Sequence, residues 1–269
     1  ADYLLVESTY GDRLHADTNP ADMLAEVIGR TAARGGTVII PAFAVGRAQT
    51  ILYYIYRLGQ EQRIPNIPVF IDSPMAGRAS EVYRLHASET QLGRDLCKAI
   101  CDFAEPVETV EESKRIDRMT KPRVIISASG MATGGRVVHH LKMLAPDERN
   151  TILFAGYQAA GTRGAHLVAG ARAVKIHGGY VPVRAEVVTL DNVSAHADYS
   201  EILAWLKRFR KRPRRTFLVH GEPEAADSLR LKIEEELGWE SVVPEYRETV
   251  DLSGAAPSAQ PVAAPATRE

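Results

Sequence analysis

Two histidines stand in turns of small residues at the ends of apolar runs. His196 lies within residues 193–199, and His220 follows Leu218-Val219 and precedes a glycine. In α/β folds, the carboxyl ends of buried strands are where catalytic side chains and ligands gather. Histidine is also the commonest metal ligand and a proton donor near neutral pH. Both residues are therefore candidates for chemistry, and a structural or surface histidine is the alternative for each.

Glu7 ends the first apolar run of the chain and enters the turn Thr9-Tyr10-Gly11. From such a position a carboxylate could orient a histidine and hold its imidazolium form. A helix-capping or salt-bridging glutamate is the alternative reading.

Three loops rich in small residues also follow strand-like runs, at residues 41–47, 127–136 and 155–164. Each loop places backbone N–H groups and one arginine near an expected helix start, an arrangement that suits phosphate recognition. Loops at the carboxyl ends of neighbouring strands could line one face and follow a polyphosphate backbone, whereas ordinary tight turns are the alternative. The candidate RNA or phosphate contacts are Arg47, Ser127, Ser129, Gly130, Thr133, Arg136, Thr162 and Arg163.

The remaining charged and titratable features favour structural roles. The basic run 207–215 could touch a nucleic acid, but a solvated helix end is favoured because cations offset the helix dipole there. Six further histidines are expected to be structural or solvated: His15, His86, His139, His140, His166 and His177.

Composition sets broad limits on the protein. With 33 basic and 34 acidic residues, the chain has no global attraction for nucleic acid. Cys97 and Cys101 are expected to be reduced residues one turn apart on a helix. No apolar run reaches the length that a bilayer requires, and nothing resembles a signal peptide, so a cytoplasmic protein without membrane contact is expected.

The hydrophobic pattern predicts an α/β fold with a mostly parallel sheet. Strand-length runs alternate with helical patterns, and their continuous hydrophobicity indicates strands covered on both faces. The expected strands are residues 3–6, 37–40, 68–71, 123–126, 151–154, 173–176, 186–190 and 216–219. One expected helix begins near Pro20. The others cover residues 47–58, 136–144, 200–209 and 222–237.

Six short motifs, taken in order, resemble the β-CASP branch of the metallo-β-lactamase superfamily, which includes RNA-processing nucleases. They occupy residues 7–13, 41–49, 129–131, 156–158, 194–198 and 219–222. The resemblance extends to about Val250. It implies that Glu7 positions His196, that His196 is a general acid beside the scissile phosphate, and that His220 binds one of two Zn²⁺ ions. The implied activity is zinc-dependent hydrolysis of RNA, in which metal-activated water attacks the phosphodiester.

The resemblance also implies a domain division. Residues 15–189 would form the β-CASP domain, and residues 1–14 and 190–252 would be the remnant of a metallo-β-lactamase domain. An RNA-specificity segment would cover about residues 155–222, and residues 253–269 would be a disordered tail.

The sequence departs from the family in one large respect. In the family, a His-x-His-x-Asp-His zinc motif precedes the position of Glu7, and this sequence does not contain it. The sequence is therefore expected to begin inside a longer protein and to lack the N-terminal half of the lactamase domain. The expected partners are the missing N-terminal half of the lactamase domain and RNA. A second copy of the chain, in a homodimer, is a further candidate partner. The chain alone is expected to bind zinc weakly and to be inactive, because a zinc site needs about four ligands.

Two other functions stay open at this point. A non-catalytic RNA-binding or scaffolding subunit would share the fold. A small-molecule α/β enzyme could use the glycine-rich loops for a phosphorylated ligand, but it leaves both histidine turns unexplained.

Overall fold

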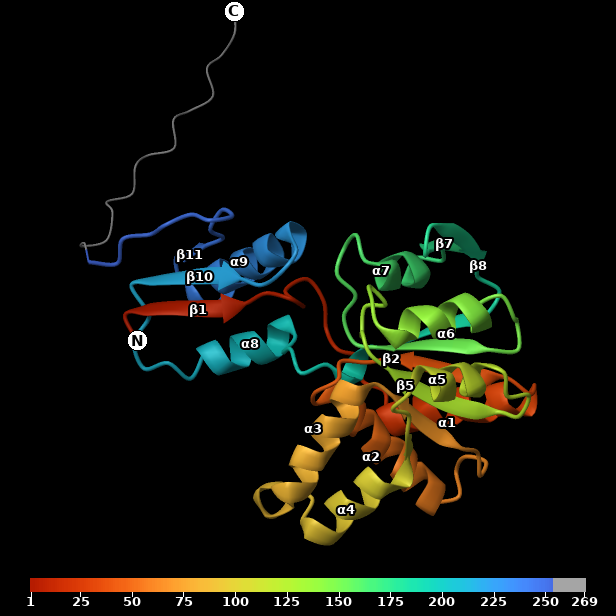
Figure 1. Cartoon of the computed structure of the whole chain (residues 1–269). Coiled ribbons are helices and arrows are strands. Elements are labelled where there is room, and N and C mark those ends of the chain that lie inside the picture. Colours follow the sequence, from red (N-terminus) through yellow and green to blue (C-terminus); the bar gives the residue numbers. More distant parts are fainter. Residues whose placement is uncertain (254–269) are drawn as a thin grey trace, which may run out of the picture. The chain divides into compact units, whose positions relative to one another are not determined.

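The computed structural model describes residues 1–253 and divides the chain into two compact units (Figure 1). Unit 1 comprises Ala1–Leu14 and the chain from His196 onward, and unit 2 comprises His15–Ala195. The tail predicted to be disordered, residues 253–269, lies outside the described residues except for Ser253.

Unit 2 is built on a six-stranded parallel sheet with the strand order β4-β3-β5-β2-β6-β9. All five residues of β2 and of β5 are buried, because helices cover both faces of these central strands. A separate antiparallel hairpin joins β7 to β8. The strands of this unit are β2 (Thr37–Pro41), β3 (Val69–Asp72), β4 (Glu105–Pro106), β5 (Arg123–Ser127), β6 (Thr151–Ala155), β7 (Ala173–Ile176), β8 (Gly179–Pro182) and β9 (Glu186–Leu190).

The two-residue period of the strands divides the core of unit 2 between the faces of the sheet. Val38 and Ile40 point into a cluster with α1, α2 and α4, whereas Ile39 between them joins α5, α6 and α7 on the other face (Figure 1). The helices are α1 (Pro20–Ala33), α2 (Arg47–Gln60), α3 (Pro74–Leu85), α4 (Arg94–Phe103), α5 (Val110–Asp117), α6 (Arg136–Leu144) and α7 (Arg163–Val168), with 3-10 turns at Ala87–Glu89 and Asp191–Val193.

Unit 1 has a three-stranded parallel sheet in which β10 lies between β1 and β11. Its core contains Leu206 of α8, Leu218 of β10 and Leu229 of α9. The elements are β1 (Tyr3–Glu7), α8 (Tyr199–Leu206), β10 (Arg215–Val219), α9 (Pro223–Leu237) and β11 (Ser241–Val242).

The predicted α/β class is confirmed, and so is each of the expected strands. The expectation of cover on both faces is wrong for β7, whose residues alternate between exposed and buried because its hairpin lies outside the main sheet. It is also wrong for β1, where Leu5 is 65% exposed. The helix expected over residues 200–209 ends at Leu206. Of the helices not predicted, α5 carries a recognisable signal, a capping box formed by Thr109 and Glu112.

The two cysteines lie on α4, as predicted, and both are free thiols. Burial, together with the neighbouring Cys97, raises the pKa of the Cys101 thiol to about 11. A raised pKa disfavours the thiolate, which is the reactive form of cysteine. Within residues 1–253, none of the helices has the length and hydropathy needed to cross a membrane.

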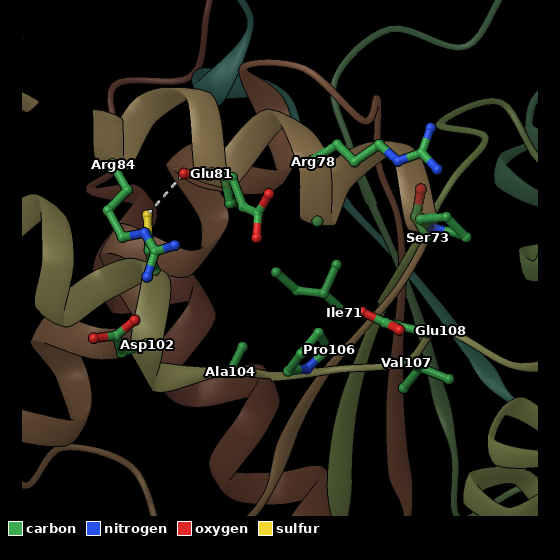
Figure 2. Close-up of a pocket in the computed structure, with 14 residues that line it drawn as sticks. Ile71, Ser73, Arg78, Glu81, Arg84, Asp102, Ala104, Pro106, Val107 and Glu108 are labelled. Atoms are coloured by element: carbon green, nitrogen blue, oxygen red, sulfur yellow. Dashed lines mark hydrogen bonds between the residues drawn. The ribbon is translucent and has the colours of Figure 1, made fainter. Parts of the chain in front are cut away.

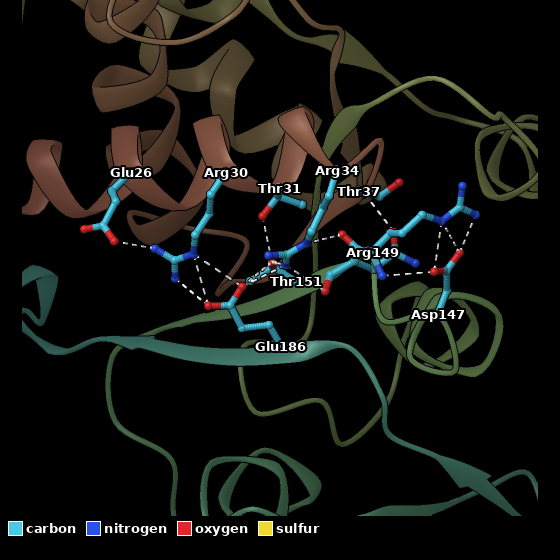
Figure 3. A network of polar contacts seen from close by, with 10 residues as sticks. Glu26, Arg30, Thr31, Arg34, Thr37, Asp147, Arg149, Thr151 and Glu186 are labelled. Carbon is cyan, nitrogen blue, oxygen red and sulfur yellow. Dashed lines mark hydrogen bonds and ion pairs between the residues drawn. The ribbon is translucent and has the colours of Figure 1, made fainter.

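A network of ion pairs connects the edge strand β9 to α1 and to its C-cap residue Arg34 (Figure 3). Glu186, the first residue of β9, accepts from Arg30 Nη2 at 2.5 Å and from Arg34 Nη2 at 2.7 Å. Arg34 also donates to the Thr151 hydroxyl of β6, at 2.5 Å. The hydrogen bond from Arg30, followed by that from Arg34, lowers the pKa of Glu186 to about 2.

We predict that Glu186→Gln lowers the free energy of unfolding by about 1 kcal/mol at neutral pH, as expected for a partly exposed ion pair. A carboxylate with a lowered pKa stabilises the fold fully above its ordinary pKa of 4.5, and this stabilisation is lost as pH falls towards about 2. Urea unfolding of both proteins at stepwise lower pH should therefore show their difference shrinking below pH 4.5. Glu26→Gln, which removes an exposed partner of Arg30, is the matched control and should change stability little. A difference between wild type and Glu186→Gln that is independent of pH would contradict the assignment.

Candidate functional site

The two strands β1 and β10 place the candidate residues of unit 1 at one edge of their sheet. The strands are parallel, and Glu7, the last residue of β1, lies opposite Val219, the last residue of β10. His220 follows directly. His196 comes from the turn before α8, whose first residues are capped by Asp198. Parallel pairing thus brings together residues that are about 190 to 210 positions apart in the chain.

Glu7 holds His196 in a defined orientation. Oε2 of Glu7 accepts a short hydrogen bond from Nδ1 of His196, and Oε1 accepts from the backbone N–H of Ala197 at 3.2 Å. The rings of His196 and His220 are stacked, with centroids 5.1 Å apart and an interplanar angle of 30°. The His196 side chain is 39% exposed, so solvent or a substrate can reach it.

Thr9 links both histidines to Glu7, a role that no local sequence pattern indicates. Its hydroxyl lies 2.9 Å from Glu7 Oε2 and 3.0 Å from His220 Nδ1. One assignment of protons fits these contacts: His196 Nδ1–H donates to Glu7, the Thr9 hydroxyl proton is shared between Glu7 Oε2 and the carbonyl of His220, each 2.9 Å away, and His220 Nδ1–H donates to Thr9. In this assignment Nδ1 is the ring nitrogen that each histidine uses within the cluster.

The backbone around His220 requires the small residue that follows it. His220 has a φ of 55°, in the left-handed region that few non-glycine residues adopt. A Cβ atom on Gly221 would overlap Ser8, whose hydroxyl donates to the carbonyl of Val219 at 3.0 Å. The close approach of these two strand ends therefore explains the His-Gly pair.

The donor set of the site fits a metal ligand at His220 but not a complete zinc site. Ligand atoms of Glu7, His196 and His220 lie within 4.8 Å of one another. The Thr9 contact fixes Nδ1 of His220, and orientation of one ring nitrogen by a hydrogen bond is typical of metal-binding histidines. However, both carboxylate oxygens of Glu7 are engaged with His196, Thr9 and Ala197. The two Nε2 atoms are fewer than the ligands that zinc needs.

The three small-residue loops of unit 2 meet at one edge of the large sheet. They follow β2, β5 and β6, which are neighbouring parallel strands. The amide of Ala42 donates to the carbonyl of Ser127 at 3.0 Å, and Gln158 Nε2 donates to the carbonyl of Gly130 at 3.2 Å. The geometry thus joins the loops, while their contact with RNA stays a prediction.

Individual loop residues differ in how available they are. The expectation that Ser127 contacts phosphate is corrected by the structure. Its buried hydroxyl donates to the carbonyl of Asp72 at 2.8 Å and is not available to a phosphate. Gly130 is likewise buried, and Thr162 caps α7 by accepting from the amide of Ala165. By contrast, Ser129 and Thr133 form a hydroxyl pair 3.1 Å apart on the exposed surface of the second loop.

Arg136 is held inward by a buried cluster of charges. Its Nη1 lies 2.6 Å from Oδ1 of Asp72, and Oδ2 of Asp72 lies 2.7 Å from Nε2 of the fully buried His140. Nδ1 of His140 contacts Asp117 at 2.6 Å. Burial opposes the charge of His140, but its hydrogen bonds to Asp117 and Asp72 outweigh burial and raise its pKa. This cluster confirms the structural role expected of His140 and favours a positioning role for Arg136.

A cavity of about 700 Å³ lies beside this cluster between α3 and the segment around β4 (Figure 2). Arg78, Glu81 and Arg84 line it from α3. Asp102 and Glu108 line it from the other side. Because both signs of charge are mixed along its walls, the cavity does not select one class of ligand.

Comparison with known proteins agrees with this architecture. Residues 48–167 match the Beta-Casp domain, and residues 180–244 match the RNA specificity domain of Zn-dependent metallo-hydrolases. The chain therefore belongs to the β-CASP family of the metallo-β-lactamase superfamily.

Relatives of this β-CASP chain are named for RNA-related functions. A ribonuclease of Thermus thermophilus is 42% identical over 233 residues, which are 83% of this chain and 52% of the relative. The transcription termination factor FttA of Pyrococcus abyssi is 34% identical over 267 residues, 93% of this chain and 40% of the relative. An RNase J-like protein of Methanocaldococcus jannaschii is 34% identical over 250 residues, 90% of this chain and 57% of the relative. The chain spans about half the length of these relatives.

We predict that Thr9→Val destabilises the chain by about 1 kcal/mol, because the buried hydroxyl that contacts Glu7 Oε2 and Nδ1 of His220 is lost. The substitution should also move the ¹⁵N chemical shifts of the His220 ring towards a mixture of tautomers. Thr9→Ser keeps the hydroxyl and should leave those shifts unchanged. If Thr9→Val left the ring signals of His220 as in the wild type, the proton assignment would be wrong.

Proposed function

We propose that this chain forms part of a zinc-dependent RNA phosphodiester hydrolase. The observation that carries the proposal is the Glu7–His196 pair stacked beside His220 at the edge of the β1–β10 sheet. The RNA specificity domain and the relative named ribonuclease support RNA as the substrate. On this proposal unit 1 belongs to the lactamase-type domain and unit 2 is the β-CASP domain.

His196 is the proposed general acid. A histidine whose Nδ1 donates to a carboxylate presents Nε2 towards a substrate, where it can transfer a proton. The Nε2 proton would pass to the oxygen that leaves when the phosphodiester is cleaved. Glu7 is the positioning residue, since it fixes the ring through Oε2 and the following backbone through Oε1.

His220 is the proposed zinc ligand, through Nε2. Bound zinc would supply Lewis acidity and lower the pKa of a coordinated water to about 7. Thr9 keeps the ring of His220 in the tautomer that leaves this nitrogen unprotonated.

The loops of unit 2 are the proposed RNA-binding surface. Ser129 and Thr133 offer exposed hydroxyls, and Arg47 and Arg163 supply positive charge near the same edge of the sheet. Contacts of this kind fix the register of an RNA backbone without reading its sequence.

A second candidate is a non-catalytic RNA-binding or scaffolding subunit of the same fold. Such a subunit would bind RNA without cleaving it. Activity of the native polypeptide separates the two candidates.

We predict that His196→Ala lowers the rate of RNA cleavage by the native polypeptide by about 10²- to 10⁴-fold, the usual contribution of a general acid. The rate should be measured on a 5′-labelled RNA with zinc present. Glu7→Gln should cause a smaller loss, because the imidazole remains but loses its charged partner. His86→Gln, at an exposed histidine of unit 2, is the control and should be as active as the wild type. Unchanged cleavage by His196→Ala would remove this residue from the mechanism.

We predict that the 269-residue chain by itself binds zinc weakly and cleaves RNA negligibly, because one ring nitrogen each from His196 and His220 cannot replace a complete ligand set. Equilibrium dialysis followed by metal analysis measures this directly. His220→Ala should abolish the weak binding that remains. Stoichiometric, tight zinc in the isolated chain would contradict the prediction.

A further inference from the structure

A second pocket, of about 430 Å³, lies within unit 2 at the amino end of α6. Thr133 and the start of α6 form one wall, and Arg163 of α7 lies near them. His139 of α6 and His177, in the turn between β7 and β8, complete the lining. Neither histidine was assigned a function from the sequence.

The charges along this pocket have a single sign. Its ionisable lining residues are two arginines and two histidines, and no carboxylate is among the described residues that line it. Arg136 is neutralised by Asp72, at 2.6 Å. Arg163 donates to the backbone carbonyls of Ala132 and Lys175, so its positive charge is not offset by these partners. A pocket of this composition suits an anion.

The two imidazoles face each other without a partner for their nitrogens. The ring centroids of His139 and His177 are 4.5 Å apart and the rings are tilted by 45°. Within residues 1–253, neither ring takes part in a hydrogen bond or an ion pair. Four ring nitrogens are therefore available to a ligand in or beside the pocket.

The surroundings of His139 disfavour the charged form of its ring. Burial lowers its pKa, and the neighbouring His177 and His140 lower it further. An anion would offset this repulsion and favour protonation. The charged or titratable groups around His139 are His140 and Lys142 on its own helix, Asp117 on α5, Arg136 at the loop, Arg163 on α7 and His177 on the hairpin.

We propose that this pocket binds a phosphoryl group, with His139 and His177 as proton-dependent donors and Arg163 as the permanent charge. The Thr133 hydroxyl supplies a further donor at the rim. The identification of the natural ligand as an RNA phosphate rests on the proposed function, whereas binding of phosphate itself does not. Affinity should rise as pH falls from about 7.5 to about 6, because a histidine takes up a proton with the anion.

The first test uses the whole chain and inorganic phosphate. Histidine ring signals should be followed by NMR during phosphate titrations at about pH 6 and about pH 7.5. The expected result is a shift of the His139 and His177 signals, with tighter binding at the lower pH. Phosphate that leaves both signals unchanged would overturn the proposal. A response of the pair to Zn²⁺ but not to phosphate would also overturn it, since it would indicate a metal site.

The second test measures binding of a short single-stranded RNA to variants of the whole chain. His139→Gln and His177→Asn should each bind roughly two- to fivefold more weakly at about pH 6 and should lose the pH dependence. Asparagine is chosen because His177 has a φ of 47°, which asparagine tolerates. His86→Gln, outside the pocket, is the matched control and should retain wild-type affinity.

The two tests separate the two proposals. Phosphate binding to the histidine pair without RNA binding would leave the pocket intact and count against the RNA hydrolase. RNA binding that is independent of pH and of both variants would leave the proposed function intact and reject RNA as the ligand of this pocket.

Discussion

The site of unit 1 depends on one constraint, the parallel pairing of β1 with β10 in a fixed register. Glu7 and Val219 end the two strands opposite each other, so His220 begins its turn where the carboxylate is placed. A shift of one residue would turn Glu7 to the other face of the sheet. The stack of His196 on His220 and the proton order through Thr9 both require this register.

In unit 2, parallel strand pairing positions whole loops in the way that it positions single side chains in unit 1. The carboxyl ends of parallel strands lie at the same edge of a sheet. Three glycine- and alanine-rich loops therefore meet there and contact one another through backbone hydrogen bonds. Polar groups buried beneath them need partners, because an unpaired buried charge is costly. Asp72, His140 and Arg136 satisfy this need together, and the second loop is thereby anchored.

Charge is distributed locally although the whole chain is nearly neutral. The net charge of −1 gives no indication of where an anion would bind. In the folded chain, acids and bases are paired in places such as Glu186 with Arg30 and Arg34, whereas the pocket beside His139 has basic lining residues without acids. Pairing elsewhere therefore leaves a few basic positions that can act on a ligand.

The sequence by itself determined the strands, the class of fold, and Glu7, His196 and His220 as candidates, because continuous apolar runs and small-residue turns are local signals. The tertiary structure alone decided which polar residues are used internally. Ser127 resembled a phosphate contact but bonds to a neighbouring strand, and Thr9 was not singled out although it connects the whole site. These outcomes depend on contacts between residues far apart in the chain, which local patterns do not encode.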